Sequence, residues 1–167
     1  LSFPGLASQT VSIFSFGKTF HATGWKMGYV VGPPHLSREV RKTHQFIVYS
    51  VNTPIQYALS EYLKDSSRYT GLGKFYQHKR DFFLSQMSGS TFEPLKTSGS
   101  YFQVFSYKNL SGKPDVEMAG EMTQKHKVAC IPVSVFYKDK TDNRLLRFCF
   151  AKKDETLERA AAILKRL

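Results

Sequence analysis

Two β-rich runs that flank a short segment containing glycine and lysine constrain this chain more than any other feature. Residues 11–16 alternate in hydrophobicity and predict a strand, and residues 25–31 predict the next strand, which is ended by Gly32-Pro33-Pro34. Between the two runs, Gly17 frees the backbone for a turn at Lys18. The chain must therefore place this lysine on an open turn between two strands.

Helical and extended segments are mixed along the rest of the chain. The apolar spacing predicts helices over residues 36–47, 55–63, 75–87, 116–122 and 157–164. Strands are predicted over residues 91–95, 101–107, 128–131 and 145–150. Asp115 and Asp154 stand where each would cap the helix that follows it. With 41% hydrophobic residues in a chain of 167, this order predicts an α/β fold with a packed core.

The composition narrows the classes of function. The net charge of +11, from 24 Lys and Arg against 13 Asp and Glu, raises the question of nucleic-acid binding. The basic residues are scattered and form no stripe, which favours a solvated surface with an anionic ligand and predicts no nucleic-acid partner. The apolar runs are short and interrupted, so the sequence predicts no membrane-spanning segment.

The cysteines and histidines indicate neither a disulfide framework nor a metal site. Cys130 and Cys149 are isolated from each other in sequence, and whether they pair stays open. Their isolation favours a reducing, cytoplasmic setting. The histidines lack the spacing of metal ligands, so no metal is predicted.

Four residues carry the candidate chemistry. Lys18 is the candidate nucleophile, because a lysine amine forms imines with carbonyl cofactors. Ser15 and Lys26 supply the kinds of donor that a phosphate needs. Arg147 lies within an apolar strand, where a guanidinium is costly unless it meets an anion such as a carboxylate. Taken alone, each of the four is also compatible with an ordinary surface position.

Taken together, the motifs resemble those of the class I/II aminotransferases, which are pyridoxal-phosphate enzymes of fold type I. Residues 15–29 (SFGKTFHATGWKMGY) are similar to the segment that carries the cofactor lysine, closest to the branch with kynurenine/glutamine transaminases and bacterial methionine aminotransferases. Four further segments resemble that branch in the same order: 50–54 (SVNTP), 99–102 (GSYF), 131–137 (IPVSVFY) and 146–152 (LRFCFAK). The resemblance covers essentially the whole chain.

The resemblance implies a cofactor, pyridoxal 5′-phosphate, and a role for each of the four residues. Lys18 would hold the cofactor as a Schiff base, be displaced by the substrate amine, and then shuttle the proton between the substrate α-carbon and the cofactor's C4′. Ser15 and Lys26 would bind the cofactor phosphate, and Arg147 would bind the substrate α-carboxylate. The phosphate-binding cation is often arginine in the wider family, whereas here it is Lys26. The family residues that hold the cofactor ring precede the lysine, beyond the start of this sequence.

The resemblance also predicts how the chain is organised. Leu1 stands in place of an initiator Met, and we expect a C-terminal portion of a longer enzyme. Residues 1–53 would be the tail of the large cofactor-binding domain, 54–88 connecting helices, and 89–167 the small C-terminal α/β domain. Removed from its partner half, the segment before Pro54 should expose apolar surface. The loop over residues 49–54 would reach the site of a second subunit in a homodimer.

The implied activity is transfer of an amino group from an amino acid to a 2-oxo acid. Substrates with large apolar, aromatic or thioether side chains are favoured, and the chain alone is expected to be inactive. Two alternatives share the fold, namely a carbon–sulfur lyase and a non-catalytic, aminotransferase-like ligand-sensing domain of a regulator. A basic nucleic-acid-binding module ranks last, because the charges form no stripe.

Overall fold

The computed structural model describes residues 3–167, and the chain divides into two compact units. One unit is Leu1–Leu72 and the other is Gly73–Leu167. The division falls in the first turn of the longest helix, α5 (Leu72–Gln86). The three-part organisation predicted from the sequence concerns a longer enzyme and stays a prediction.

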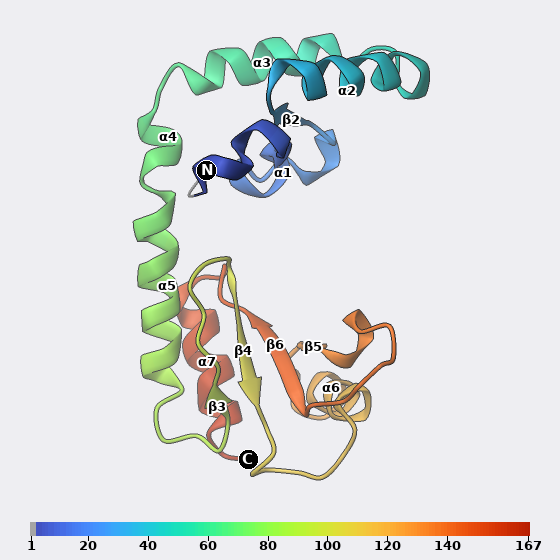
Figure 1. Cartoon of the computed structure of the whole chain (residues 1–167). Helices are drawn as coiled ribbons and strands as arrows, with labels where there is room; N and C mark the ends of the chain where they lie inside the picture. Colours follow the sequence, from blue (N-terminus) through green and yellow to red (C-terminus); the bar gives the residue numbers. More distant parts are fainter. Residues whose placement is uncertain (1–2) are drawn as a thin grey trace. The chain divides into compact units, whose positions relative to one another are not determined.

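The first unit is a β-hairpin followed by helices (Figure 1). Its elements are η1 (Pro4–Gln9), β1 (Ser12–Ser15), α1 (Phe16–Thr19), η2 (Thr23–Trp25), β2 (Gly28–Val31), α2 (Pro34–Ile47), α3 (Thr53–Leu63) and α4 (Ser67–Thr70). The strands pair antiparallel, from Ser12 opposite Val31 to Ser15 opposite Gly28. Pro34 begins α2, where its missing N–H costs nothing, and Asn52 Oδ1 caps α3 by accepting from Ile55 N at 3.1 Å.

Much of the apolar surface in this unit is uncovered. The side chains of Ile13, Val31, Phe46 and Ile47 are 80%, 55%, 86% and 76% exposed. A two-stranded hairpin has no second layer against which to bury them. The predicted apolar exposure before Pro54 is therefore confirmed.

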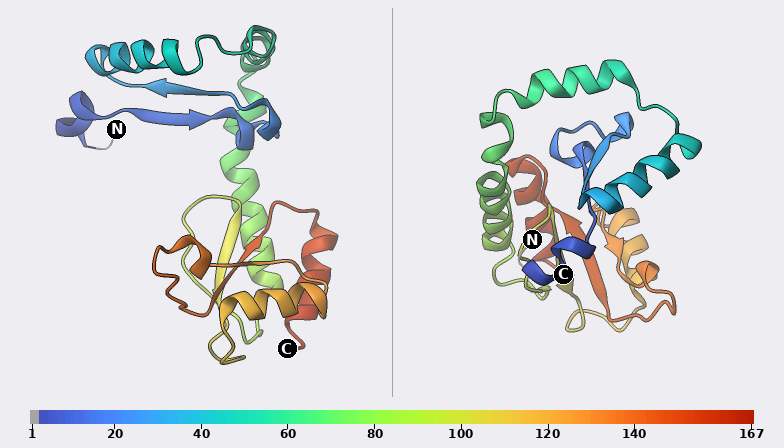
Figure 2. Two further views of the ribbon diagram at one scale, coloured as in Figure 1. Left: turned by 90° about the vertical axis from the view of Figure 1, so that its right-hand side faces the viewer. Right: turned by 45° about the horizontal axis from the view of Figure 1, so that its top comes forward.

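The second unit is a four-stranded antiparallel sheet with three helices (Figures 1 and 2). The strands are β3 (Glu93–Pro94), β4 (Phe102–Ser106), β5 (Ile131–Pro132) and β6 (Leu145–Cys149), in the order β3-β4-β6-β5. The helices are α5, α6 (Asp115–Gln124) and α7 (Asp154–Leu164), with the 3₁₀ turn η3 (Ser134–Phe136) between β5 and β6. Helices α5 and α7 are joined by an ion pair between Lys79 Nζ and Asp154 Oδ1 at 2.6 Å.

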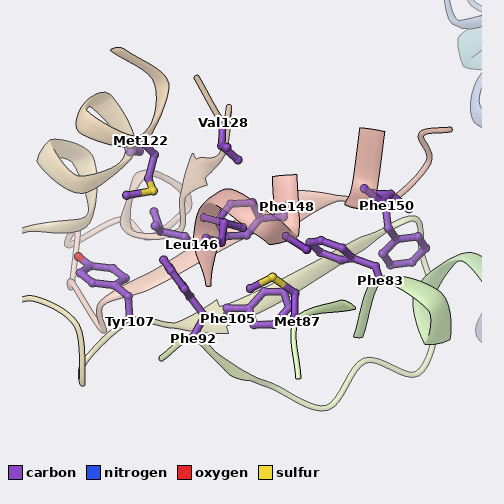
Figure 3. Close-up of a cluster of buried hydrophobic side chains, with 14 of the residues drawn as sticks. Phe83, Met87, Phe92, Phe105, Tyr107, Met122, Val128, Leu146, Phe148 and Phe150 are labelled. Carbon is purple, nitrogen blue, oxygen red and sulfur yellow. The ribbon is translucent and has the colours of Figure 1, made fainter. Parts of the chain in front are cut away.

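The core of this unit is built around aromatic rings that meet edge to face (Figure 3). The Phe105 ring on β4 lies 5.7 Å from that of Phe83 on α5 and 5.8 Å from that of Phe148 on β6. Leu146 and Phe148 are buried, whereas Arg147 between them is partly exposed. Because successive strand side chains alternate between faces, β6 directs Arg147 to the face opposite the core.

Three expectations from the sequence are wrong in detail. Asp115 and Asp154 do not cap their helices but are the first residues of them, and their carboxylates bind Ser134 and Lys79 instead. The strand predicted over 128–131 is Ile131–Pro132, at the sheet edge where a proline costs no ladder bond. The strand expected from Trp25 begins at Gly28.

Candidate active site

The lysine predicted to react lies on the connection between β1 and β2. Ser15 ends β1 and caps the single turn of α1, its Oγ accepting from Gly17 N at 3.1 Å. The connection is closed at its base, where Phe16 N donates to Met27 O at 3.0 Å. Lys18 falls within α1 and its side chain is exposed. The open turn predicted for this lysine is therefore a short capped helix.

Two glycines of this connection sit where no other residue fits without a shift. A Cβ on Gly28 would lie 2.3 Å from the carbonyl oxygen of Phe14 in the paired strand. A Cβ on buried Gly17 would lie 3.2 Å from Thr23 Cα. Both close contacts are with backbone atoms, which cannot swing aside as a flexible side chain can. These glycines therefore set how tightly the lysine turn packs against the hairpin.

The second cation of the motif follows η2 in an unusual backbone conformation. Lys26 has a φ of 54°, in the left-handed region that non-glycine residues seldom adopt, and its side chain is exposed. It lies two residues before Gly28, which pairs with Ser15. Ser15, Lys18 and Lys26 are thus gathered at one end of the hairpin, although the sequence separates Ser15 from Lys26 by a turn and a 3₁₀ segment.

An aromatic pocket of about 510 Å³ adjoins this connection. The Phe14 and Tyr29 rings stack at 4.8 Å between centroids, and the Phe20 ring meets Tyr62 edge to face at 5.0 Å. Its lining includes Ser15 together with Phe14, Phe16, Phe20, Tyr29, Leu63 and Tyr69. Sequence reasoning did not find this pocket, although aromatic residues recur through the lysine motif.

Arg147, the fourth candidate, belongs to the second unit. On β6 it lies opposite Val104 of β4 and Ile131 of β5. Its guanidinium carbon is 4.6 Å from the centroid of the Phe102 ring and 5.0 Å from that of Phe136. Within residues 3–167, no carboxylate lies at ion-pair distance from it. Rings lie over this guanidinium, and its N–H edges are available to an anion.

The structure therefore places three of the four predicted residues on one connection and the fourth in the other unit. The two rings over Arg147 were not singled out from the sequence. The signal that could have found them is their place in the motifs: Phe102 ends the segment 99–102, and Phe136 lies in the segment 131–137.

The described part of the chain contains neither a metal-binding cluster nor a membrane-spanning helix. No group of three or more His, Cys, Asp or Glu residues there is arranged to hold a metal ion. None of the helices described is both long and apolar enough to cross a membrane.

Comparison with known proteins identifies the family. The family model of aminotransferase class I and II matches residues 5–164. The chain belongs to this family. Its fold is the α/β architecture of the C-terminal part of fold type I transferases, as the sequence predicted. Enzymes of the class I and II aminotransferase family depend on pyridoxal phosphate.

Individual aminotransferases resemble this chain along its whole length. Methionine aminotransferase of Escherichia coli (strain K12) is 45% identical over 168 residues, which cover 100% of this chain and 44% of that protein. Kynurenine–oxoglutarate transaminase 3 of Rattus norvegicus is 35% identical over 184 residues, which cover 98% of this chain and 40% of that protein.

Solved structures agree with the sequence matches. An Escherichia coli protein with a methionine aminotransferase function superposes with a TM-score of 0.94 at 45% identity, covering 100% of this chain and 44% of its own. N-succinyldiaminopimelate aminotransferase from Mycobacterium tuberculosis superposes with a TM-score of 0.86 at 31% identity. The match covers 98% of this chain and 43% of that protein. The chain thus spans less than half the length of these aminotransferases.

Proposed function

We propose that the protein carrying this sequence is an aminotransferase that moves an amino group from an amino acid to a 2-oxo acid, with pyridoxal phosphate as cofactor. The observation that carries the proposal is the gathering of Ser15, Lys18 and Lys26 at one end of the hairpin, in a chain of this family. The relatives named for methionine and kynurenine support substrates with thioether, aromatic or other large apolar side chains.

The donors on the lysine connection fit the cofactor's phosphate and aldehyde. Ser15 Oγ accepts from Gly17 N, so the hydroxyl hydrogen can be donated to a phosphate oxygen. The Lys26 ammonium would add a point charge, and Lys18 would hold the aldehyde carbon. When bound, the cofactor supplies the electron sink for charge that develops at the substrate α-carbon.

Lys18 would have two tasks in turn. It would hold the aldehyde carbon until the substrate amine displaces it, and its freed Nζ would then carry the proton away from the substrate α-carbon, which requires an amine within reach of that carbon. Arg147 would bind the substrate carboxylate through two parallel N–H donors, which fixes the substrate's orientation as well as its affinity. The rings of Phe102 and Phe136 would hold the guanidinium plane ready.

The assembly is part of the proposal. We propose a cytoplasmic homodimer in which the loop over residues 49–54 reaches the partner's site. Tyr49 is 80% exposed with a φ of 64°, and the neighbouring Phe46 is 86% exposed, so this end of α2 offers uncovered apolar surface. Because the chain spans 44% of its methionine aminotransferase relative, we expect residues 1–167 alone to turn over no amino acid.

The test is reductive trapping at a single lysine. The protein is incubated with pyridoxal phosphate, reduced with borohydride, and mapped by peptide mass spectrometry, with Lys18→Ala as the variant. The control is Lys64→Ala, which removes an exposed lysine paired only with Glu61 in the described structure. We expect one dominant adduct, at Lys18, that persists in the control. Adducts spread over many lysines and unchanged in Lys18→Ala would overturn the proposal.

Product analysis separates the alternatives in the full-length protein. An aminotransferase exchanges the amino group for an oxo group and needs a 2-oxo acid acceptor. A carbon–sulfur lyase of the same fold would release ammonia and a free thiol without an acceptor. A ligand-sensing domain would carry the adduct at Lys18 but show no turnover at all.

A further inference from the structure

A buried carboxylate in the second unit binds a turn rather than its own helix. Asp115 is 1% exposed and Ser134 is 5% exposed. Asp115 Oδ1 accepts from Ser134 Oγ at 2.6 Å, and Oδ2 accepts from Ser134 N at 2.7 Å. Within residues 3–167, Asp115 has no cationic partner at ion-pair distance. Its charge is therefore stabilised by these hydrogen bonds and by its place in the first turn of α6.

These two bonds fix the start of a very short turn. Ser134 is the first residue of η3 and Phe136 is the last. The turn is otherwise held by its own bonds, from Phe136 N to Val133 O at 3.1 Å and from Tyr137 N to Ser134 O at 3.0 Å, and by Val133 N, which donates to Leu145 O of β6 at 3.3 Å. A single 3₁₀ turn is weak by itself, so its place depends on these outside bonds, of which the two to Asp115 are the shorter.

The ring that this turn carries lies over Arg147. The Phe136 side chain is 58% exposed, so burial alone does not hold it in place. The other ring over Arg147, Phe102, is part of the sheet itself, opposite Cys149 in the register. Of the two rings, that of Phe136 thus depends on the placement of η3.

We propose that Asp115 is a positioning residue for substrate binding, which acts through Ser134 and η3 to hold Phe136 over the Arg147 guanidinium. The inference rests on the proposed function, in which Arg147 binds the substrate carboxylate. A guanidinium with a ring over it cannot tilt freely, so its N–H edge meets a carboxylate without first losing rotamer freedom. Loss of the Asp115 anchor leaves the charge of Arg147 intact and removes part of this preorganisation.

The experiment measures carboxylate binding in the full-length enzyme. The probe is 3-phenylpropionate, which has a carboxylate and an aromatic side chain but no amino group, and its dissociation constant is measured by calorimetry. Asp115→Asn keeps the shape but turns an amide N–H₂ toward a donor of Ser134. Ser134→Ala keeps the backbone bond and removes only the hydroxyl. Phe136→Leu removes the ring.

The variants at Asp115 and Phe136 form a double-mutant cycle, in which probe binding is compared between the single variants and the double variant. Since one cation–π contact is worth about 0.5–2 kcal/mol, Phe136→Leu should weaken probe binding between about 2-fold and 30-fold. Asp115→Asn should approach that loss, Ser134→Ala should show less, and the double variant Asp115→Asn/Phe136→Leu should be no worse than Phe136→Leu alone. The KM for the amino acid should rise by the same factor with kcat within about 2-fold, as for loss of uniform binding.

The control is Asp154→Asn, which removes the charge of a helix-starting aspartate bound to Lys79 in the same unit. We expect this variant to bind the probe as wild type does, whatever it does to the melting temperature. If Asp115→Asn binds the probe as tightly as wild type, or if its effect adds fully to that of Phe136→Leu, the inference is wrong while transamination stands. Wild-type protein that does not bind the probe would overturn the role proposed for Arg147 and the inference with it. If Asp115→Asn fails to fold, Ser134→Ala completes the same cycle.

Discussion

The substitution Gly28→Ala tests whether the close packing of the lysine connection sets the phosphate site. An alanine Cβ there would lie 2.3 Å from the Phe14 carbonyl oxygen, whereas ordinary van der Waals contact begins at 3.4 Å. The obstructing atom is backbone of the paired strand, so β1 and β2 must separate by about 1 Å. Ser15 directly follows Phe14, and it would move away from Lys26 by a similar distance.

Two costs follow from this shift. Overpacking of this kind destabilises a fold by about 1–3 kcal/mol. A misplacement of about 1 Å in a positioned site can cost on the order of 100-fold. We therefore expect the dissociation constant for pyridoxal phosphate to rise between about 5-fold and 100-fold in the full-length protein.

The assay is equilibrium dialysis of the cofactor against wild type, Gly28→Ala and a matched control. Gly24→Ala lies on the same connection, but its Cβ would meet nothing within 4 Å. We expect the control to bind the cofactor as wild type does. If the two alanine variants bind it equally well, the close approach of β2 to β1 does not shape the phosphate site.

Two predictions concern titrating side chains. Burial raises the pKa of Cys130 to about 12, whereas Cys149 is exposed. At pH 8, iodoacetamide should therefore modify Cys149 well before Cys130, as measured by peptide mass spectrometry. Faster labelling of Cys130 would contradict its burial. Hydrogen bonds from Lys113 and Lys125 lower the pKa of Glu121 from 4.5 to about 2. The ionised Glu121 side chain therefore stabilises the fold above pH 4.5, and this contribution is lost as the pH falls toward 2. The difference in urea unfolding midpoint between wild type and Glu121→Gln should therefore shrink over that range, and a constant difference would refute it.

Periodic segments were predictable, and contacts between distant residues were not. The 3.6-residue spacing located α2, α3, α5 and α7 to within a few residues, because it reflects a local property of one element. Asp115 looked like a helix cap because aspartate before an apolar run is a local signal. Its carboxylate instead binds Ser134, 19 residues away, and no local pattern encodes that choice. The start of β2 was misplaced because the left-handed turn at Lys26 does not interrupt the hydrophobic alternation.

By itself the sequence determined the family and the α/β class, and it supplied the candidates for the chemistry, since each depends on residue type and order along the chain. Gly17 and the capping Ser15 act within a few residues of Lys18, so this part of the motif carries its own local geometry, whereas Gly28 acts across the strand pair on Phe14. Only the tertiary structure decided how Arg147 is held. Its rings come from β4 and η3, and the anchor of η3 comes from α6, so the arrangement exists only once these elements pack together.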